Sequence, residues 1–415
     1  MTDQNETAET GADAAVGAVF GAHDARTLAQ LRDVAARAER VALMADGHVG
    51  YVMPIGGVAA YRDRVSVVGV GFDIACGNAA IRTDRTVADF APAEWARVAD
   101  EIQRAISFGV GRKNRADDAP TDHPLFGAAA WDALPDAARR DELRAKARAQ
   151  LGTVGSGNHY VDVFADEAGA VWVGVHFGSR GLGHTVASGF LALSQGAEWG
   201  ARVPERETLL DLGAPLGDGY WALMQLAGEY AYAGREWVAR KVVALLGARE
   251  VELVHNHHNF AWRETHGDAS LVVVRKGATP AFPGQRGFVG GSMGDRSVIL
   301  VGSDADTPLQ RAAMYSTVHG AGRVMSRAEA RGKVRGWGKR ARVVSPGKIT
   351  HEMLRDWLAP LGVVLRGGGL DEAPQAYRRL PDVLAAQGET VRVLHTLTPL
   401  VVVMAGADEY DPYKD

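Results

Sequence analysis

The chain has 415 residues, of which 47% are hydrophobic and 23% charged, and it carries a formal net charge of −4. This composition is typical of a soluble globular protein, long enough for one large domain or two to three ordinary ones. The slightly negative charge excludes a basic field over the whole surface, so any site for a polyanion must be a local cluster of Arg and Lys.

The N-terminal segment and the cysteine content indicate the compartment. The first 25 residues carry acidic side chains rather than a basic stretch, which argues against a signal peptide. No apolar run is long enough to span a bilayer, and a single cysteine cannot form an internal disulfide. We therefore expect a cytoplasmic protein with no membrane segment.

Hydrophobic periodicity predicts the elements along the chain. Residues 1–22 are small and polar and are expected to form a disordered tail, and 107–135, rich in Gly, Asp and Pro, a long loop. Helical spacing predicts helices at 27–40, 92–106, 217–246 and 306–316. Runs rich in β-branched residues predict strands at 64–70, 159–164, 171–177, 251–256, 271–277, 297–302 and 399–406.

Many of the 50 glycines stand beside these predicted strands. With strands and helices mixed along the chain, the pattern favours an α+β fold: glycine-rich mixed sheets with helices, and an active site at strand ends and Gly turns. No internal boundary is evident, so we expect a single large domain over residues 23–406, followed by an acidic tail over 407–415.

Metal-ligand residue types recur beside Gly turns. The stretch "GFDIACG" holds Asp73 and Cys76, the only cysteine, while His159 and His176 belong to predicted strands and three histidines stand at 255, 257 and 258. Mn²⁺, Zn²⁺ and Fe²⁺ accept imidazole, carboxylate and thiolate together, and a bridging thiolate would suit two ions. A lone cysteine, or a histidine at a strand end, is equally typical of a packed core, so the spacing alone leaves both interpretations open.

Two further stretches suit an anionic ligand. His319 precedes Gly-Ala-Gly and a helix predicted to start near Arg323, an arrangement that can cradle phosphate and place an imidazole to carry phosphorus covalently. Arg323 and Arg327 would add charge-assisted donors. The stretch "RKGATPAFPGQRGFVGGSMGDRS" adds more donors, namely Arg275, Lys276, Ser292 and Ser297. The alternatives are a helix-capping turn with a structural histidine and a polar glycine loop.

Taken together, these stretches resemble the RtcB family of RNA-splicing ligases. The matching text, in the family's order, is "DGHVGYVMPIGGVAA", "GVGFDIACGNAAIRT", "DHPLF", "LGTVGSGNHYVDV", "VHFGSRGLG", "HHNFA", "RKGATPA", "GGSMGDRS", "YSTVHGAGRVMSR" and "DEAPQAY". The resemblance covers about residues 43 to 406 and implies an RtcB-like domain.

The resemblance implies a GTP-dependent ligase that uses two Mn²⁺ ions. It would join an RNA 3′-phosphate or 2′,3′-cyclic phosphate to a 5′-hydroxyl, in RNA repair or tRNA splicing. A histidine–GMP adduct forms first, GMP then moves to the 3′-phosphate, and the 5′-hydroxyl displaces it. Some relatives need an archease-type activator protein.

The resemblance also assigns roles to residues. It implies His319 as the catalytic nucleophile and a metal-ligand set of Asp73, Cys76, His159, His176 and His258. Nucleotide contacts would come from Asn158, Asp162, Ser292, Ser297, Gly320, Gly322 and Met404. Contacts to phosphates or to the RNA end would come from Arg180, Lys276 and Arg323.

Two positions depart from the family pattern: Asp162 stands where Glu is usual, and Met404 where Lys is usual. Both positions are associated with the guanine base, so we expect weaker discrimination of GTP over ATP. Two other functions stay open at this point. One is capping of RNA or DNA 3′-phosphate ends without joining, and the other is a catalytically idle paralogue that binds metal and RNA.

Overall fold

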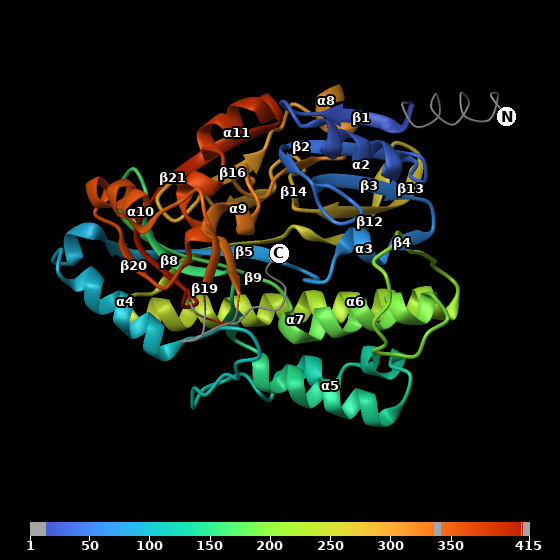
Figure 1. The fold of residues 1–415 in the computed structure, drawn as a ribbon, viewed down its shortest axis with the longest axis horizontal. Coiled ribbons are helices and arrows are strands. Elements are labelled where there is room, and N and C mark those ends of the chain that lie inside the picture. Colours follow the sequence, from blue (N-terminus) through green and yellow to red (C-terminus); the bar gives the residue numbers. More distant parts are fainter. Residues whose placement is uncertain (1–13, 336–341, 408, 410–415) are drawn as a thin grey trace.

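The structure, a computed structural model, describes residues 14–335, 342–407 and 409 (Figure 1). Two main sheets organise it. One has five strands in the order β1 (Val16–Val19), β2 (Arg40–His48), β3 (Ile55–Tyr61), β13 (Ala269–Lys276) and β12 (Asn259–His266). The other has eight, in the order β11 (Glu250–His257), β5 (Gly77–Thr86), β9 (Ala170–Phe177), β8 (Tyr160–Ala165), β21 (Val391–Met404), β16 (Ser297–Gly302) and β15 (Arg286–Val289), with β20 (Val364–Arg366) beside β21.

Short strand pairs connect and flank these sheets. They are β4 (Arg64–Ser66) with β10 (Leu209–Asp211), β6 (Ser107–Phe108) with β7 (Thr153–Gly155), β14 (Ala278–Pro280) with β17 (Ser316–Val318), and β18 (Gly332–Arg335) with β19 (Arg342–Pro346). The helices are α2 (Ala25–Ala35), α3 (Val67–Val70), α4 (Glu94–Ala105), α5 (Ala137–Gln150), α6 (Arg180–Ser194), α7 (Pro215–Leu245), α8 (Pro308–Ala312), α9 (Arg327–Arg331), α10 (His351–Leu358) and α11 (Leu380–Gln387).

The long helix α7 packs against both halves of the molecule and runs beneath the sheets in Figure 1. Its second half contributes Val238 and Val242 to a core built from the valine-rich faces of β8 and β9 and from Ala79 and Ile81 of β5. Its first half contributes Tyr220 and Leu223 to a larger core with residues of β2, β3 and β13. One buried helix therefore joins the cores of the two sheets, and mixed sheets with helices in a single large domain agree with the predicted α+β class. None of the described helices is both long and apolar enough to cross a membrane.

Many predicted elements are confirmed, and several are wrong in their extent. The strand at 297–302 and the helices at 92–106 and 217–246 match β16, α4 and α7 closely. The helix predicted to reach residue 40 ends at Ala35, and β2 follows it. The strand predicted at 64–70 turns after Ser66 into α3, because the Ser66 hydroxyl accepts a hydrogen bond from the Gly69 amide and caps a short helix.

The ends of the chain differ in part from the prediction. Val16–Val19, expected in a disordered tail, forms β1 and pairs in parallel with β2. Residues 1–13 lie outside the described residues, as do 408 and 410–415 of the predicted acidic tail. The helix expected from Arg323 begins only at Arg327, after the cap residue Ser326. The helix predicted at 306–316 is confined to Pro308–Ala312.

Candidate active site

A cavity of about 320 Å³ opens where strand ends of the two sheets meet. The chain crosses from the eight-stranded to the five-stranded sheet between β11 and β12, and His258 is the residue at that crossing. Thirteen of the predicted site residues line the cavity, and twelve of them are Asp73, Cys76, Asn158, His159, Asp162, His176, His258, Ser292, His319, Gly320, Gly322 and Arg323. Met404, at the end of β21, lines it as well.

Cys76 lies between two histidines of neighbouring strands. Its Sγ is 3.7 Å from Nε2 of His159 and 3.6 Å from Nε2 of His176, and the three ligand atoms lie within 4.8 Å of one another. All three residues are buried. Asp73 joins them through Oδ2, which is 3.1 Å from Nε2 of His159. These four side chains thus point sulfur, nitrogen and oxygen donors at one small space.

The outer nitrogens of both histidines are held by fixed partners. Nδ1 of His159 lies 2.9 Å from the carbonyl oxygen of Val154, and Nδ1 of His176 lies 2.6 Å from Oδ1 of Asn78. A carbonyl or amide oxygen can only accept, so each Nδ1 carries a proton, and in the neutral form of each ring Nε2 keeps its lone pair toward Cys76. Metal-binding histidines are oriented in this way by their second partner, so the residues fit a transition-metal site.

The backbone next to Cys76 adopts a strained conformation that orients the ligand side chains. Ala75 has φ of 61°, a left-handed conformation that is unfavourable for a residue with a Cβ. Its amide donates to the Asn259 carbonyl and its own carbonyl accepts from the guanidinium of Arg235. Gly77 has no room for a side chain, because an added Cβ would meet the Asn256 carbonyl oxygen at 2.2 Å. The turn therefore aims Asp73 and Cys76 at the histidines.

Burial and charge set the protonation of the two ligands on this turn. Burial raises the pKa of the Cys76 thiol well above its usual range, and the Asp73 carboxylate raises it further. Burial would also raise the pKa of Asp73, but the hydrogen bond and charge of His159, with the charge of Arg180, overcome this and lower it to about 2. A cation between them would favour the thiolate, the form that binds metal.

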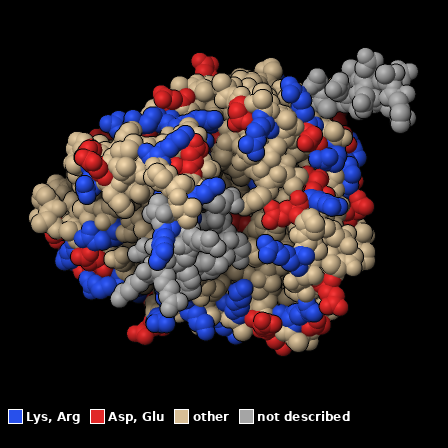
Figure 2. Space-filling model, viewed as in Figure 1, with Lys and Arg blue, Asp and Glu red and all other residues tan. Residues whose placement is uncertain are grey.

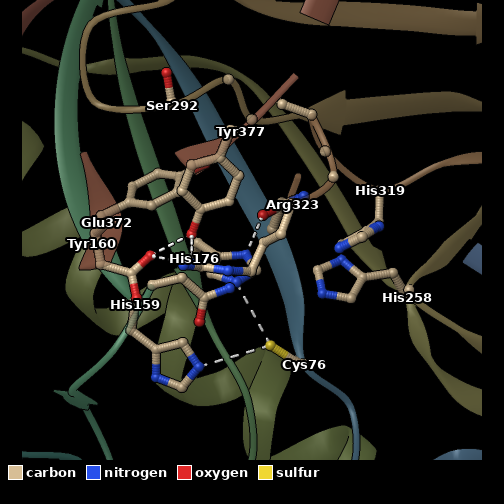
Figure 3. Close-up of a pocket in the computed structure, with 18 of the residues that line it drawn as sticks. Cys76, His159, Tyr160, His176, His258, Ser292, His319, Arg323, Glu372 and Tyr377 are labelled. Carbon is tan, nitrogen blue, oxygen red and sulfur yellow. Dashed lines mark hydrogen bonds and ion pairs between the residues drawn. The ribbon is translucent and has the colours of Figure 1, made fainter. Parts of the chain in front are cut away.

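His258 and His319 form the opposite wall of the cavity. Their rings are 4.9 Å apart, and His258 also stacks on His176 at 5.1 Å (Figure 3). Nδ1 of His258 is buried without a hydrogen-bond partner among the described residues. Burial, with the neighbouring His319, lowers the pKa of His258 well below its usual value, so its imidazole is neutral and can act as a ligand.

His319 is fixed by Asp46, a residue that the sequence analysis did not single out. The Asp46 carboxylate lies 2.6 Å from Nδ1 of His319 and accepts the backbone amides of His319 and Gly320 through the same oxygen. Gly322 adopts φ of 73° and packs its Cα on the Asp46 backbone, which excludes a side chain there. The Gly turn thus holds the Nδ1 edge of His319 on Asp46, which leaves Nε2 for the cavity.

Three predicted contact residues lie elsewhere. Lys276 is buried, and its Nζ donates to the Val68 carbonyl at 2.8 Å instead of reaching the cavity. Ser297 does not line the cavity, and its hydroxyl accepts a hydrogen bond from the Gly291 amide. Arg180 does not line the cavity and instead brings Nη1 to 3.2 Å from Nδ1 of His159. Local sequence cannot show the orientations of Lys276 and Arg180, because their partners come from other elements of the chain.

The predicted phosphate contact Arg323 lines the cavity but is already paired. Its guanidinium donates to the Tyr377 hydroxyl at 2.8 Å and lies 3.4 Å from the Glu372 carboxylate, which also pairs with Arg327. Glu372 and Tyr377 come from the family motif "DEAPQAY", for which the sequence alone predicts no role. Membership of this motif was therefore the feature of the sequence that could have indicated Glu372 and Tyr377 as site residues. His48, Asn78, Tyr160, Asn259 and Arg327 also line the cavity.

The far end of the cavity is formed by β8 and β21. Their register sets Asp162 opposite Val402 and Tyr160 opposite Met404, and all four line the cavity. His159 was predicted within a strand, but β8 begins only at Tyr160, and both Asn158 and His159 line the cavity. Burial raises the pKa of Asp162 well above its usual value, and its Oδ1 has no partner among the described residues.

Comparison with known proteins agrees with this geometry. The family described as tRNA-splicing ligase RtcB matches residues 24–405. The chain belongs to the RtcB family. It is 33% identical to the tRNA-splicing ligase RtcB of Archaeoglobus fulgidus and 32% identical to that of Thermococcus kodakarensis, each over 82% of both chains. It is 30% identical to the RNA-splicing ligase RtcB of Escherichia coli K12, over 88% of this chain and 90% of that one. Within an RtcB protein, the cavity with its cysteine–histidine cluster is the candidate active site.

Proposed function

We propose that this RtcB protein is an RNA ligase that joins a 3′-phosphate or 2′,3′-cyclic phosphate end to a 5′-hydroxyl end in RNA repair or tRNA splicing. The observation that carries the proposal is His319, held on a Gly turn by Asp46 and facing His258 across a cavity with a cysteine–histidine cluster. The names of its relatives support a ligase that acts on RNA.

We propose GTP as the nucleotide and His319 as the nucleophile. Nε2 of His319 attacks the α-phosphorus, a nitrogen–phosphorus bond forms, the α–β anhydride bond breaks and pyrophosphate leaves. The imidazole gains positive charge in this step, and the Asp46 carboxylate beside Nδ1 stabilises it. Gly320 and Gly322 leave room for phosphate at the turn, and Asn158 and Ser292 line the cavity within which the nucleotide would lie.

Two further transfers complete the reaction. An oxygen of the RNA 3′-phosphate attacks the phosphorus of the adduct, which frees His319 and leaves GMP on the RNA end; water first opens a cyclic phosphate. The 5′-hydroxyl then attacks the 3′-phosphate, gives up its proton and expels GMP. Arg323, held by Glu372 and Tyr377, offers a fixed cation at the cavity for these phosphates.

We propose that two Mn²⁺ ions bind to Asp73, Cys76, His159, His176 and His258. The mixture of thiolate, imidazole and carboxylate suits Mn²⁺ better than Mg²⁺, which prefers oxygen ligands. When bound, such ions neutralise triphosphate charge and polarise the phosphorus under attack. The fixed Nδ1 protons of His159 and His176 keep both Nε2 lone pairs available for this role.

The decisive experiment compares wild type with His319→Ala after incubation with labelled GTP or ATP and Mn²⁺. We expect a covalent adduct on wild type and none on the variant. Wild type should then join a 3′-phosphate RNA to a 5′-hydroxyl RNA, with and without an archease-type protein. A capped but unjoined 3′ end would identify an end-capping enzyme instead. An absent adduct would identify the idle paralogue.

Cys76→Ser tests the metal proposal separately. Serine keeps the shape of the turn but replaces the soft thiolate with a hydroxyl that stays protonated. We expect the Mn²⁺ affinity of the purified protein to fall at least about tenfold, and adduct formation with it, while the melting temperature changes little. A variant that unfolds but still binds Mn²⁺ like wild type would show that Cys76 serves packing.

A further inference from the structure

A second cavity, of about 900 Å³, lies outside the catalytic one. It is formed by the C-terminal end of α4, by β6 and by the loop that follows β6, with Lys241 of α7 at one side. Five basic and two acidic side chains line it: Arg104, Arg112, Lys113, Arg115, Lys241, Asp117 and Asp118. Neither the catalytic steps nor the metal site proposed above uses any of them.

This basic lining is local. The chain as a whole carries a net charge of −4, and Figure 2 shows basic and acidic side chains interspersed over the visible face, without an extended field of one sign. A cavity with an excess of cations on such a protein concentrates positive potential, because its walls exclude water and focus the field.

Three of the five cations have no carboxylate partner among the described residues. Lys241 pairs with Asp118 at 2.9 Å, and Arg112 pairs with Glu409. No such pair involves Arg104, Lys113 or Arg115, and all three are exposed. Within the described part of the chain, no carboxylate therefore neutralises these three charges, and they face solvent.

The loop that carries these cations is firmly held by its other residues. The Asn114 backbone amide donates to the Ala149 carbonyl at 2.8 Å, and its side-chain amide donates to the Leu151 carbonyl at 2.9 Å. Trp237 of α7 donates its indole N–H to the Asp118 carbonyl at 3.0 Å. Because these contacts fix the backbone, Lys113 and Arg115 project from a platform with a defined shape.

The wall of the second cavity is joined to the wall of the catalytic one by the pairing of β6 with β7. Phe108 of β6 lines the second cavity and pairs with Gly155 of β7, whose carbonyl also accepts the Gly109 amide. The same segment continues through Gly157 to Asn158 and His159, which line the catalytic cavity. Beside the unpaired cations, the half-buried ring of Phe108 offers a surface for base stacking.

We propose that this second cavity binds the sugar–phosphate backbone of the RNA beyond the ends that react, with Arg104, Lys113 and Arg115 as its phosphate contacts. The inference rests on the proposed RNA ligase function and names a binding site for that substrate. Single-stranded RNA is favoured over an acidic protein because the cations stand around a concave cavity with an aromatic side chain in its wall, and not on an open flat face.

The test is the salt dependence of RNA binding. Fluorescence anisotropy with a labelled single-stranded RNA of about 20 nucleotides is measured over a series of KCl concentrations for wild type and for the triple variant Arg104→Gln, Lys113→Gln, Arg115→Gln. Each lost phosphate contact lowers the slope of log K against log salt by about 0.7, so the triple variant should lose about 2 from the slope. Its affinity at low salt should fall about tenfold or more, and a dinucleotide 3′-phosphate should bind both proteins equally.

A matched control removes the same charge elsewhere. Arg26, Arg37 and Arg40 are exposed residues of or beside α2 and β2, on the opposite side of Figure 1 from α4, and their triple Gln variant should bind RNA like wild type. Equal losses in the two triple variants would overturn the proposal, since the effect would then be one of net charge. Poly-glutamate serves as a probe for an acidic protein. If the triple variant Arg104→Gln, Lys113→Gln, Arg115→Gln binds RNA like wild type and loses only the binding of poly-glutamate, the proposal is overturned as well, because the cavity would then serve an acidic protein.

The two proposals fail in different ways. Formation of the His319 adduct from labelled GTP requires no RNA, so it reports the catalytic cavity alone. If wild type binds RNA with the expected slope but joins no ends, the ligase function is wrong and the second binding site stands. If wild type joins ends and the triple variant keeps the wild-type slope, only the second site is wrong.

Discussion

The carboxylate of Asp46 lies 2.6 Å from Nδ1 of His319 although 273 residues separate the two along the chain. Asp46 is fully buried at the end region of β2 and also accepts the amides of His319 and Gly320. One carboxylate oxygen therefore fixes the backbone turn and the ring of the proposed nucleophile together.

Asp46→Asn should slow formation of the histidine adduct about 100-fold. The amide keeps the shape of the side chain and one acceptor for the backbone amides, but it loses the negative charge that stabilises the imidazole as it becomes cationic. Rapid-quench measurement of the adduct from labelled GTP gives the rate. Mn²⁺ affinity, measured by calorimetry, should stay at the wild-type value because Asp46 does not contact the cysteine–histidine cluster. An unchanged adduct rate would show that Asp46 serves only the turn.

Asp46 also shows where reasoning from sequence stops. The helix predicted over 27–40 ran into what is β2, and β2 carries Asp46. Periodicity located β16 and α7 well because their apolar patterns are long and regular. It could not show that a carboxylate of β2 meets a histidine turn far along the chain, since this contact depends on how the β14–β17 pair packs against β2.

The candidate site also has a part that the sequence could predict and a part that it could not. Family motifs brought forward the cluster of Asp73, Cys76 and the three histidines, which the structure places around one cavity. Lys276 was expected at a phosphate and is instead buried against the Val68 carbonyl. A lysine within a motif carries no local mark of the direction of its side chain, which is set here by burial between β13 and α3.

Arg235 of α7 supports the proposed metal site from behind. It is fully buried, and its guanidinium donates to the carbonyls of Ala75 and Phe177, which are adjacent to Cys76 and His176. It also lies 2.8 Å from Nδ1 of His257, the neighbour of His258. One guanidinium thus ties together three segments that carry proposed ligands, including the strained Ala75.

Arg235→Met should lower Mn²⁺ affinity about tenfold or more, because the ligand segments lose their common anchor. Arg275→Met is the matched control: Arg275 is equally buried but pairs with Glu264, away from the cluster. Both variants should melt at lower temperature, and only Arg235→Met should weaken the Co²⁺–thiolate absorption of the Co²⁺-loaded protein. Equal metal affinity in the two folded variants would assign Arg235 to stability alone.

Lys276 should make stability depend on pH. Burial lowers its pKa from 10.5 to about 8. Between about pH 8 and 10.5 the unfolded chain therefore binds more protons than the folded one, so the free energy of unfolding contributed by this residue rises with pH across that window. Below about pH 8 the buried ammonium is charged in the folded state, and its full desolvation penalty is present.

Lys276→Met removes this titration. The stability of the variant relative to wild type should be greatest below about pH 8 and should decline by roughly 2–3 kcal/mol as the pH rises to 10.5. Urea unfolding at a series of pH values measures the difference, with the exposed Lys333→Met as the control that should show no such trend. If the difference in the free energy of unfolding between Lys276→Met and wild type does not vary with pH, the pKa of Lys276 is not lowered by burial.

Asp162 and Met404 should weaken the preference for GTP over ATP. They stand on adjacent strands at one end of the cavity, at positions that the family resemblance associates with guanine and where Glu and Lys are usual. The Asp162 side chain is one methylene shorter than Glu, and Met404 cannot donate a hydrogen bond to the guanine O6. Burial raises the Asp162 pKa, which favours a neutral carboxyl group with one donor and one acceptor, a pattern that the N1 and N6 edge of adenine can also satisfy.

The measurement is the ratio of adduct rates with GTP and ATP, for wild type and for the double variant Asp162→Glu, Met404→Lys. A site that hydrogen-bonds a specific group rejects an analogue without it far more strongly than a site that only encloses it. The double variant should therefore raise the GTP-to-ATP ratio by at least about tenfold, mainly by slowing the reaction with ATP. Wild-type discrimination equal to or stronger than that of relatives with Glu and Lys would contradict this prediction, and would place base recognition on other residues that line the cavity.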